Sequence, residues 1–139
     1  MAEIINQQRK IKIETKIFQT FAETAIEQIA NSKTATIAFI SDKKMSELNR
    51  DFRGKNSTTD VLSFPYKADE FDVDDSFLGD IVISLEQANR QAIENNLTLE
   101  LEVKQLILHG ILHLLGYDHE TDNGEMNALE LKWREQLQI

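Results

Sequence analysis

Three histidines are the residues of this sequence whose type and spacing most directly indicate chemistry. The chain contains 3 His, and they stand at positions 109, 113 and 119. On a helix, His109 and His113 would project from the same face, one turn apart. Gly116 can adopt the left-handed conformation that ends a helix, so the chain can turn back and bring His119 near the pair. Three imidazoles that meet from one side predict a metal site.

Three neutral imidazoles that leave a coordination position open are typical ligands of catalytic zinc, which activates water and polarises a scissile group. A structural zinc site is less favoured, because it usually has four protein ligands and the chain has no Cys. Asp118 or Asp122 remains a candidate fourth ligand, and nickel or iron would also accept imidazole. The alternative is that the histidines are packed in the core, where each would need a polar partner.

The spacing of the histidines also matches the metalloprotease pattern H-E-x-x-H-x-x-G-x-x-H, with the glycine in register at position 116. The glutamate that acts as general base in that pattern is replaced here by Gly110. A peptidase hypothesis therefore loses its proton shuttle and rests on ligand spacing alone.

Length and composition favour one globular domain, residues 1–139, in the cytoplasm. The 139 residues include only 1 Pro and 5 Gly, and no run of 18 apolar residues or compact apolar start is present. We therefore expect neither a membrane span nor a secretory signal. The net charge of −9 disfavours a protein that follows a long nucleic acid duplex. The charge is segregated, because residues 42–56 are net basic and residues 67–80 are strongly acidic.

The pattern of apolar residues predicts a small α+β fold, in which about five helices pack on a mixed, mostly four-stranded sheet. The apolar helix from Thr98 to Leu115 is expected to be the central, buried helix that carries the metal ligands. The acidic stretch 67–76 is expected to be a loop. Strands are predicted at 34–40, 61–64 and 78–84 and weakly at 4–13, and other helices at 15–30, 42–52, 85–95 and after Asp122, which with Glu125 resembles a capping box.

Three stretches of the sequence resemble the YbeY family of rRNA-maturation endoribonucleases. Residues 109–119 match its motif H-G-x-L-H-L-x-G-Y-D-H at every position. Residues 48–65 resemble its block L-N-x-x-(Y/F)-R-x-x-D-x-x-T-D-V-L-S-F-P, and residues 78–84 resemble its strand G-D-I-x-I-S. The similarity extends from about residue 34 to the end of the chain. Two loop positions depart from the family pattern, with Asn56 in place of Asp and Thr58 in place of Pro.

The resemblance implies a metal-dependent endoribonuclease, specific for single strands, that matures the 3′ end of small-subunit ribosomal RNA and takes part in ribosome quality control. It implies that His109, His113 and His119 bind one zinc ion and that Arg53 is functionally important. The implied partners are single-stranded RNA, the small ribosomal subunit, a small-subunit ribosomal protein and a ribosome-associated GTPase.

Arg53 has a physical role available in such a site. A guanidinium near the metal can bind a phosphate through two hydrogen bonds and offset the charge that develops during its transfer. The alternatives are a solvated side chain or a structural bridge to the acidic loop. The attacking group is either a metal-activated hydroxide or the 2′-hydroxyl of the RNA, and the sequence leaves both open.

Other polar and aromatic residues have weaker claims to the site. Arg50 and Lys55 are either aids to backbone binding or ordinary charges at a helix end. Asp80 is either a carboxylate that orients a histidine through its second ring nitrogen or a surface group. Asp118 is a candidate base or supporting group. Tyr117 and Phe64 offer rings for stacking on a base, although core packing is favoured for both.

A second hypothesis for the whole chain is a ribosome-assembly factor without catalysis, in which a structural metal stiffens the turn at Gly116. The acidic net charge and the absence of a glutamate at position 110 favour it. Cleavage of RNA by the metal-loaded protein would separate the two hypotheses.

Overall fold

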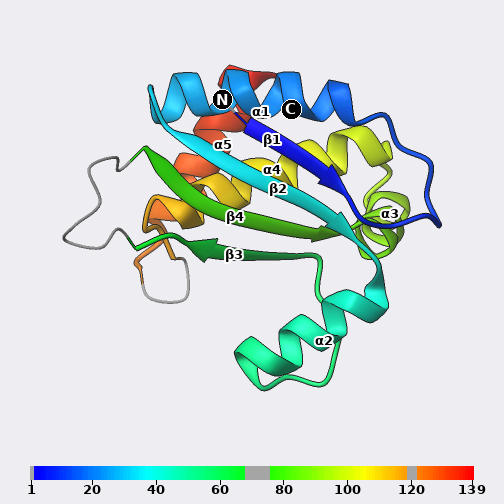
Figure 1. Cartoon of the computed structure of the whole chain (residues 1–139). Helices are drawn as coiled ribbons and strands as arrows, with labels where there is room; N and C mark the ends of the chain where they lie inside the picture. The colour runs from blue at the N-terminus through cyan, green and yellow to red at the C-terminus, as the bar shows by residue number, and fades with distance from the viewer. Residues whose placement is uncertain (1, 68–75, 119–121) are drawn as a thin grey trace.

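The computed structural model describes residues 2–67, 76–118 and 122–139. Figure 1 shows a curved sheet with helices α1, α4 and α5 on one side of it. The acidic stretch predicted to be a loop lies mostly outside the described residues, as does His119. The elements in chain order are β1 (Ala2–Asn6), α1 (Thr15–Ile29), β2 (Thr34–Ile40), α2 (Asp42–Arg53), β3 (Val61–Pro65), β4 (Phe77–Ser84), α3 (Leu85–Glu94), α4 (Leu99–Leu114) and α5 (Glu125–Leu137).

The sheet has four strands in the order β1-β2-β4-β3, so β1 and β3 are its edges. β1 pairs with β2 and β2 with β4 in parallel, whereas β3 runs antiparallel to β4. The four-stranded mixed sheet and five helices confirm the predicted α+β class. The weakly predicted first strand was too long, because β1 ends at Asn6. After β1, the buried Gln8 side chain makes two hydrogen bonds to the backbone of Ile11. Its amide nitrogen donates to the Ile11 carbonyl, and its amide oxygen accepts from the Ile11 amide, which stabilises a turn where an extended strand was predicted.

Helix α4 is the central helix, as predicted. The Thr98 hydroxyl caps its N-terminus by accepting from the Leu101 amide at 3.1 Å, and Glu100 and Glu102 lie in the first turn, where the helix dipole favours acidic groups. Its residues Val103, Ile107 and Ile111 belong to the main core, which also takes residues from α1, β2 and β4. Its opposite side packs through Leu108 and Leu112 on Met126 of α5. α4 is therefore packed between the sheet and α5.

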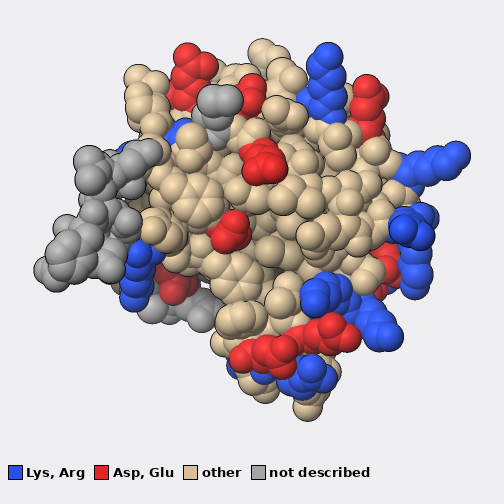
Figure 2. Space-filling model, in the orientation of Figure 1, with Lys and Arg blue, Asp and Glu red and all other residues tan. Residues whose placement is uncertain are grey.

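Among the described elements, α2 covers one end of the other face of the sheet. Met45 of α2 packs there on Ile40, Leu62 and Val82. The rest of this face is visible in Figure 2, where Lys and Arg lie near the margins and the centre is mostly uncharged with isolated acidic groups. This view shows no continuous basic surface of the kind that follows a nucleic acid duplex.

The start of α2 is fixed by the carboxylate of Asp42, which joins three segments. Its Oδ1 accepts from the Ser84 hydroxyl at 2.7 Å and from the Thr58 hydroxyl at 3.1 Å, and its Oδ2 accepts from an Arg90 nitrogen at 2.6 Å. Burial by itself would raise the pKa of Asp42. The hydrogen bonds from Ser84, Arg90 and Thr58, together with the charge of Arg90, outweigh it and hold the pKa below its ordinary value. Thr58, one of the two departures from the family pattern, is thus part of this junction.

Replacing Asp42 with asparagine is expected to lower the free energy of unfolding at pH 7 by about 1–2 kcal/mol, because charge-assisted hydrogen bonds are lost. A carboxyl group whose pKa is lowered by folding stabilises the folded state at pH values above the pKa of the unfolded chain. This stabilisation is lost as the pH falls through the pKa of the folded state. The difference in urea midpoint between Asp42→Asn and the wild type should therefore narrow below about pH 4. Asp51→Asn, which removes an exposed carboxylate from the same helix, is the control and should change little. A difference that stays constant with pH would contradict this account.

In the described part of the chain, no helix combines the length and apolar character that crossing a membrane requires.

Candidate active site

The two histidines of α4 face each other across one helical turn. Their Nε2 atoms are 3.1 Å apart, and the ring centroids are 4.6 Å apart with the ring planes inclined at 68°. The four-residue spacing on a continuous helix produces this convergence, as the sequence predicted. Both imidazoles thus direct the nitrogen remote from the backbone to one point.

This arrangement fits a bound divalent cation. Two nitrogens that each lie about 2.0–2.1 Å from a tetrahedral zinc ion are separated by roughly 3.3 Å, close to the observed Nε2–Nε2 distance of 3.1 Å. Imidazole is also the ligand type that zinc, nickel and iron accept. His109 and His113 are therefore suited to hold one cation between them.

The third predicted ligand, His119, lies outside the described residues. Within the described ranges, no group of three His, Asp or Glu side chains is placed to hold a metal ion. The turn that precedes His119 is well defined. Gly116 has φ +99°, the Gly116 amide donates to the His113 carbonyl, and the Tyr117 amide donates to the Leu112 carbonyl. This paired capping ends α4 at the predicted glycine and turns the chain away from the helix axis.

A pocket of ≈ 310 Å³ contains both described histidines and Arg53. Arg53 is the last residue of α2, which ends at the left-handed Gly54. Within the described ranges, Arg53 makes no hydrogen bond or ion pair. The acidic loop that a structural bridge from Arg53 would reach lies mostly outside those ranges. The remaining lining residues come from the loop before β3, from β3 and from the turn after α4: Thr59, Asp60, Val61, Leu62, Ser63 and Asp118.

The second ring nitrogen of His109 is engaged from α5. Its Nδ1 lies 2.7 Å from Oε1 of Glu130, a carboxylate that is buried. The hypothesis that Asp80 orients a histidine is not supported by its position. Asp80 is exposed and lines an apolar hollow on the opposite face of the sheet with Ile5 and Val82.

Sequence reasoning missed Glu130, although a signal was present. Glu130 follows Met126 by four residues and precedes Trp133 by three, so it falls on the buried stripe of α5. A carboxylate on a buried helical stripe needs a polar partner. The capping of α5 also differs from the predicted box, because Asp122 accepts from the Met126 and Gly124 amides and Glu125 accepts from the Asn123 amide.

Position 110 has no room for the glutamate of the metalloprotease pattern. Gly110 is buried against β4, and a Cβ added to it would lie 2.8 Å from Cγ2 of Ile81. The next residue after His109 on this helix therefore faces the sheet and not the pocket. A peptidase mechanism with a base at this position is excluded by packing.

Comparison with known proteins decides the family. A family model described as Endoribonuclease YbeY matches residues 3–138 of the chain. The chain belongs to the Endoribonuclease YbeY family. Among curated relatives, the Endoribonuclease YbeY of Clostridioides difficile is 37% identical over 139 residues, which covers 94% of this chain and 89% of the relative. That of Aquifex aeolicus is 43% identical over 128 residues and covers 91% and 81%.

A solved structure has the same fold. A Thermotoga maritima protein studied in solution superposes with a TM-score of 0.68 at 28% sequence identity, and the match covers 99% of this chain and 89% of the other. The fold described above is therefore the fold of that protein over nearly the whole chain.

Several residues that the sequence suggested less strongly for RNA binding do not line the pocket of this YbeY family member. Arg50 pairs with Asp51 at 3.3 Å on the exposed side of α2, and Lys55 is exposed and absent from the pocket lining. Phe64 packs edge-on against Phe52, with ring centroids 5.2 Å apart, on the open face of the sheet. Core packing was expected for Tyr117 but is wrong, because this side chain is 40% exposed.

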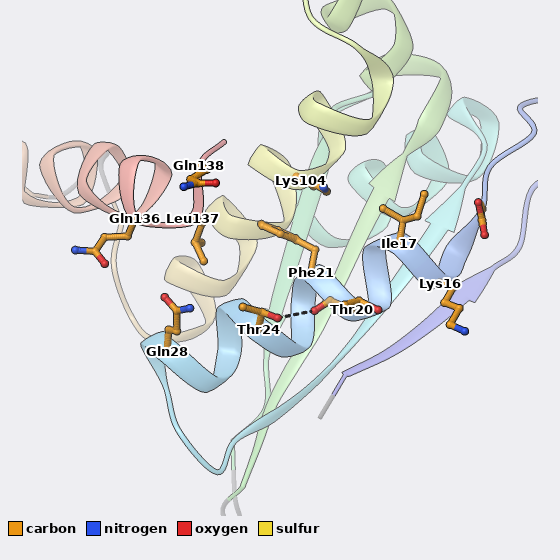
Figure 3. Close-up of a pocket in the computed structure, with 11 residues that line it drawn as sticks. Lys16, Ile17, Thr20, Phe21, Thr24, Gln28, Lys104, Gln136, Leu137 and Gln138 are labelled. Atoms are coloured by element: carbon orange, nitrogen blue, oxygen red, sulfur yellow. Dashed lines mark hydrogen bonds between the residues drawn. The ribbon is translucent and has the colours of Figure 1, made fainter.

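A second hollow of ≈ 540 Å³ lies between α1 and the C-terminal end of α5 (Figure 3). Phe21 and Lys104 meet there, with the ammonium 5.6 Å from the ring centroid, and the Thr24 hydroxyl donates to the Thr20 carbonyl at 3.0 Å. It contains no histidine and shares no lining residue with the His109 pocket. Its charged lining residues are Glu14, Lys16 and Lys104, without a converging pair of imidazoles, so the histidine pocket remains the candidate active site.

Proposed function

We propose that this chain is a metal-dependent endoribonuclease that cleaves single-stranded RNA, with the small-subunit ribosomal RNA as its substrate in 3′-end maturation. The observation that carries the proposal is the shared pocket, which contains the converging His109–His113 pair and Arg53, a residue without an ion-pair partner in the described ranges. Membership of the Endoribonuclease YbeY family supports RNA as the substrate. The small-subunit assignment and the role in ribosome quality control rest on the family resemblance, and the cytoplasmic location remains the expectation drawn from length and composition.

His109 and His113 would hold the cation, with His119 as the third nitrogen ligand from the turn after Gly116. When bound, a zinc ion in such a site supplies a Lewis acid next to the scissile phosphate. The protein's own contribution is to bind and orient that phosphate. The Arg53 guanidinium, which lines the pocket, would donate two hydrogen bonds to its oxygens and offset the negative charge that increases during transfer.

Two aspartates, Asp60 and Asp118, and two hydroxyl residues complete the polar lining of the pocket. The Asp118 carboxylate is a candidate acceptor for the proton of the attacking water or 2′-hydroxyl. Ser63 also lines the pocket, and its hydroxyl can donate to a phosphate or ribose oxygen, whereas the Thr59 hydroxyl donates to Asp60 Oδ1 at 3.3 Å. Recognition would thus be local, which agrees with the net charge of −9.

Metal-loaded protein is expected to cut a single-stranded RNA that contains the 3′ region of small-subunit ribosomal RNA and to leave the same sequence intact as a duplex. Denaturing gel electrophoresis with a chelator-treated sample as control measures this. Intact RNA accompanied by binding to the small ribosomal subunit would instead support the non-catalytic assembly factor. Turnover of a peptide substrate without RNA cleavage would overturn the nuclease proposal.

A further inference from the structure

A buried carboxylate on α5 lies between the histidine pair and an arginine on the same helix. Glu130 is 9% exposed, with its Oε1 2.7 Å from His109 Nδ1 and its Oε2 3.6 Å from an Arg134 nitrogen. A carboxylate buried this deeply is costly unless it is hydrogen-bonded and paired. Here the imidazole and the guanidinium lie against different oxygens of the same group.

Glu130 approaches His109 from the side away from Arg53. A polar pocket of ≈ 550 Å³ lies there and is lined by Glu130 and Arg134, with Gln91, Glu102 and Gln105 around them. This pocket and the Arg53 pocket share only Asp60 and His109 among their lining residues. His109 therefore lines both pockets, and among the described contacts Glu130 meets its ring from the second pocket.

We propose that Glu130 is a positioning residue that fixes the tautomer and the orientation of His109. An ionised carboxylate can only accept, so the Nδ1–H of His109 donates to Glu130 Oε1. The neutral ring then has its lone pair on Nε2, the atom that faces His113. Arg134 stabilises the ionised carboxylate from the other side. The inference rests on the proposed function, because it assigns His109 Nε2 as a cation ligand.

Removing the carboxylate should weaken cation binding without touching the substrate pocket. In Glu130→Ala, the His109 ring loses its Nδ1 partner and is free to adopt either tautomer, so the affinity for Zn²⁺ is expected to fall by about 10–100-fold. Glu130→Gln retains an acceptor oxygen without the charge, and its affinity should lie between those of Glu130→Ala and the wild type. Glu135→Gln is the matched control, because it removes one carboxylate from the exposed side of the same helix and should bind Zn²⁺ like the wild type.

The experiment combines a Zn²⁺ competition titration with NMR detection of the histidine ring nitrogens in metal-free protein. The wild type is expected to show His109 protonated on Nδ1, and Glu130→Ala is expected to lose that signature while its thermal unfolding remains cooperative. Wild-type Zn²⁺ affinity together with an unchanged Nδ1–H signal in Glu130→Ala would overturn the inference. Should Glu130→Ala not fold, the same two readouts on Glu130→Gln decide it.

The failure of the proposed function is distinguishable from the failure of this inference. A wild-type protein that binds no Zn²⁺ would contradict the proposed metal site. The tautomer of His109, which is measured without metal, would still show whether Glu130 positions the ring.

Discussion

Replacing Arg53 with alanine is expected to lower kcat/KM for single-stranded RNA by about 10²–10³-fold and to leave Zn²⁺ affinity unchanged. Arg53 lines the histidine pocket and has no ion-pair partner within the described ranges, so its guanidinium is available to the scissile phosphate. Its removal takes away charge stabilisation that is strongest when phosphate charge develops, while the two described cation ligands on α4 are untouched. Initial rates on a labelled RNA, together with a Zn²⁺ titration, measure both quantities.

Two further variants make the Arg53 prediction specific. Arg53→Lys keeps the charge but loses the planar pair of donors, so only part of the activity should return. Arg50→Ala removes an equal charge from the same helix, at an exposed side chain outside the pocket that already pairs with Asp51. An equal loss in Arg50→Ala and Arg53→Ala would mean that general attraction of RNA, and not phosphate binding in the pocket, is responsible.

The histidine helix could be predicted from sequence because everything that defines it is local. The Thr98 cap, the apolar run and Gly116 fix where α4 begins and ends, and helical periodicity then places His109 and His113 together. Arg53 could be connected to them only through the family resemblance. Its place in the pocket depends on how α2 meets β3, which no local pattern encodes.

The partner of His109 could not be assigned from sequence for a different reason. Glu130 is 21 residues away from His109, on another helix, and the contact depends on how α5 packs against α4. Asp80 could not be assigned to either face of the sheet from sequence. Ile81, Val82 and Ile83 that follow it are all apolar and buried, so the sequence of β4 does not show which residues face α4. The structure shows that Ile81 and Ile83 belong to the core under α4, so Asp80 points to the opposite face.

Replacing His113 with alanine is expected to abolish RNA cleavage and to lower Zn²⁺ affinity by more than about 100-fold, since loss of a supporting residue alone costs 10–100-fold. The reason is that one of two nitrogens 3.1 Å apart is removed from the proposed cation site. Lys104→Gln, a charge change on the same helix beside Phe21, is the control and should retain both properties. Retained cleavage in His113→Ala would point to a contaminating nuclease or to a site elsewhere.

The metal content of the purified wild type beside that of His109→Ala and His113→Ala is the most direct measurement. Elemental analysis of folded protein after removal of loosely bound ions should find one divalent cation per wild-type chain and none retained by either variant. A wild type without a cation, or a variant that retains the full content, would contradict the central claim that these two imidazoles hold the ion beside Arg53.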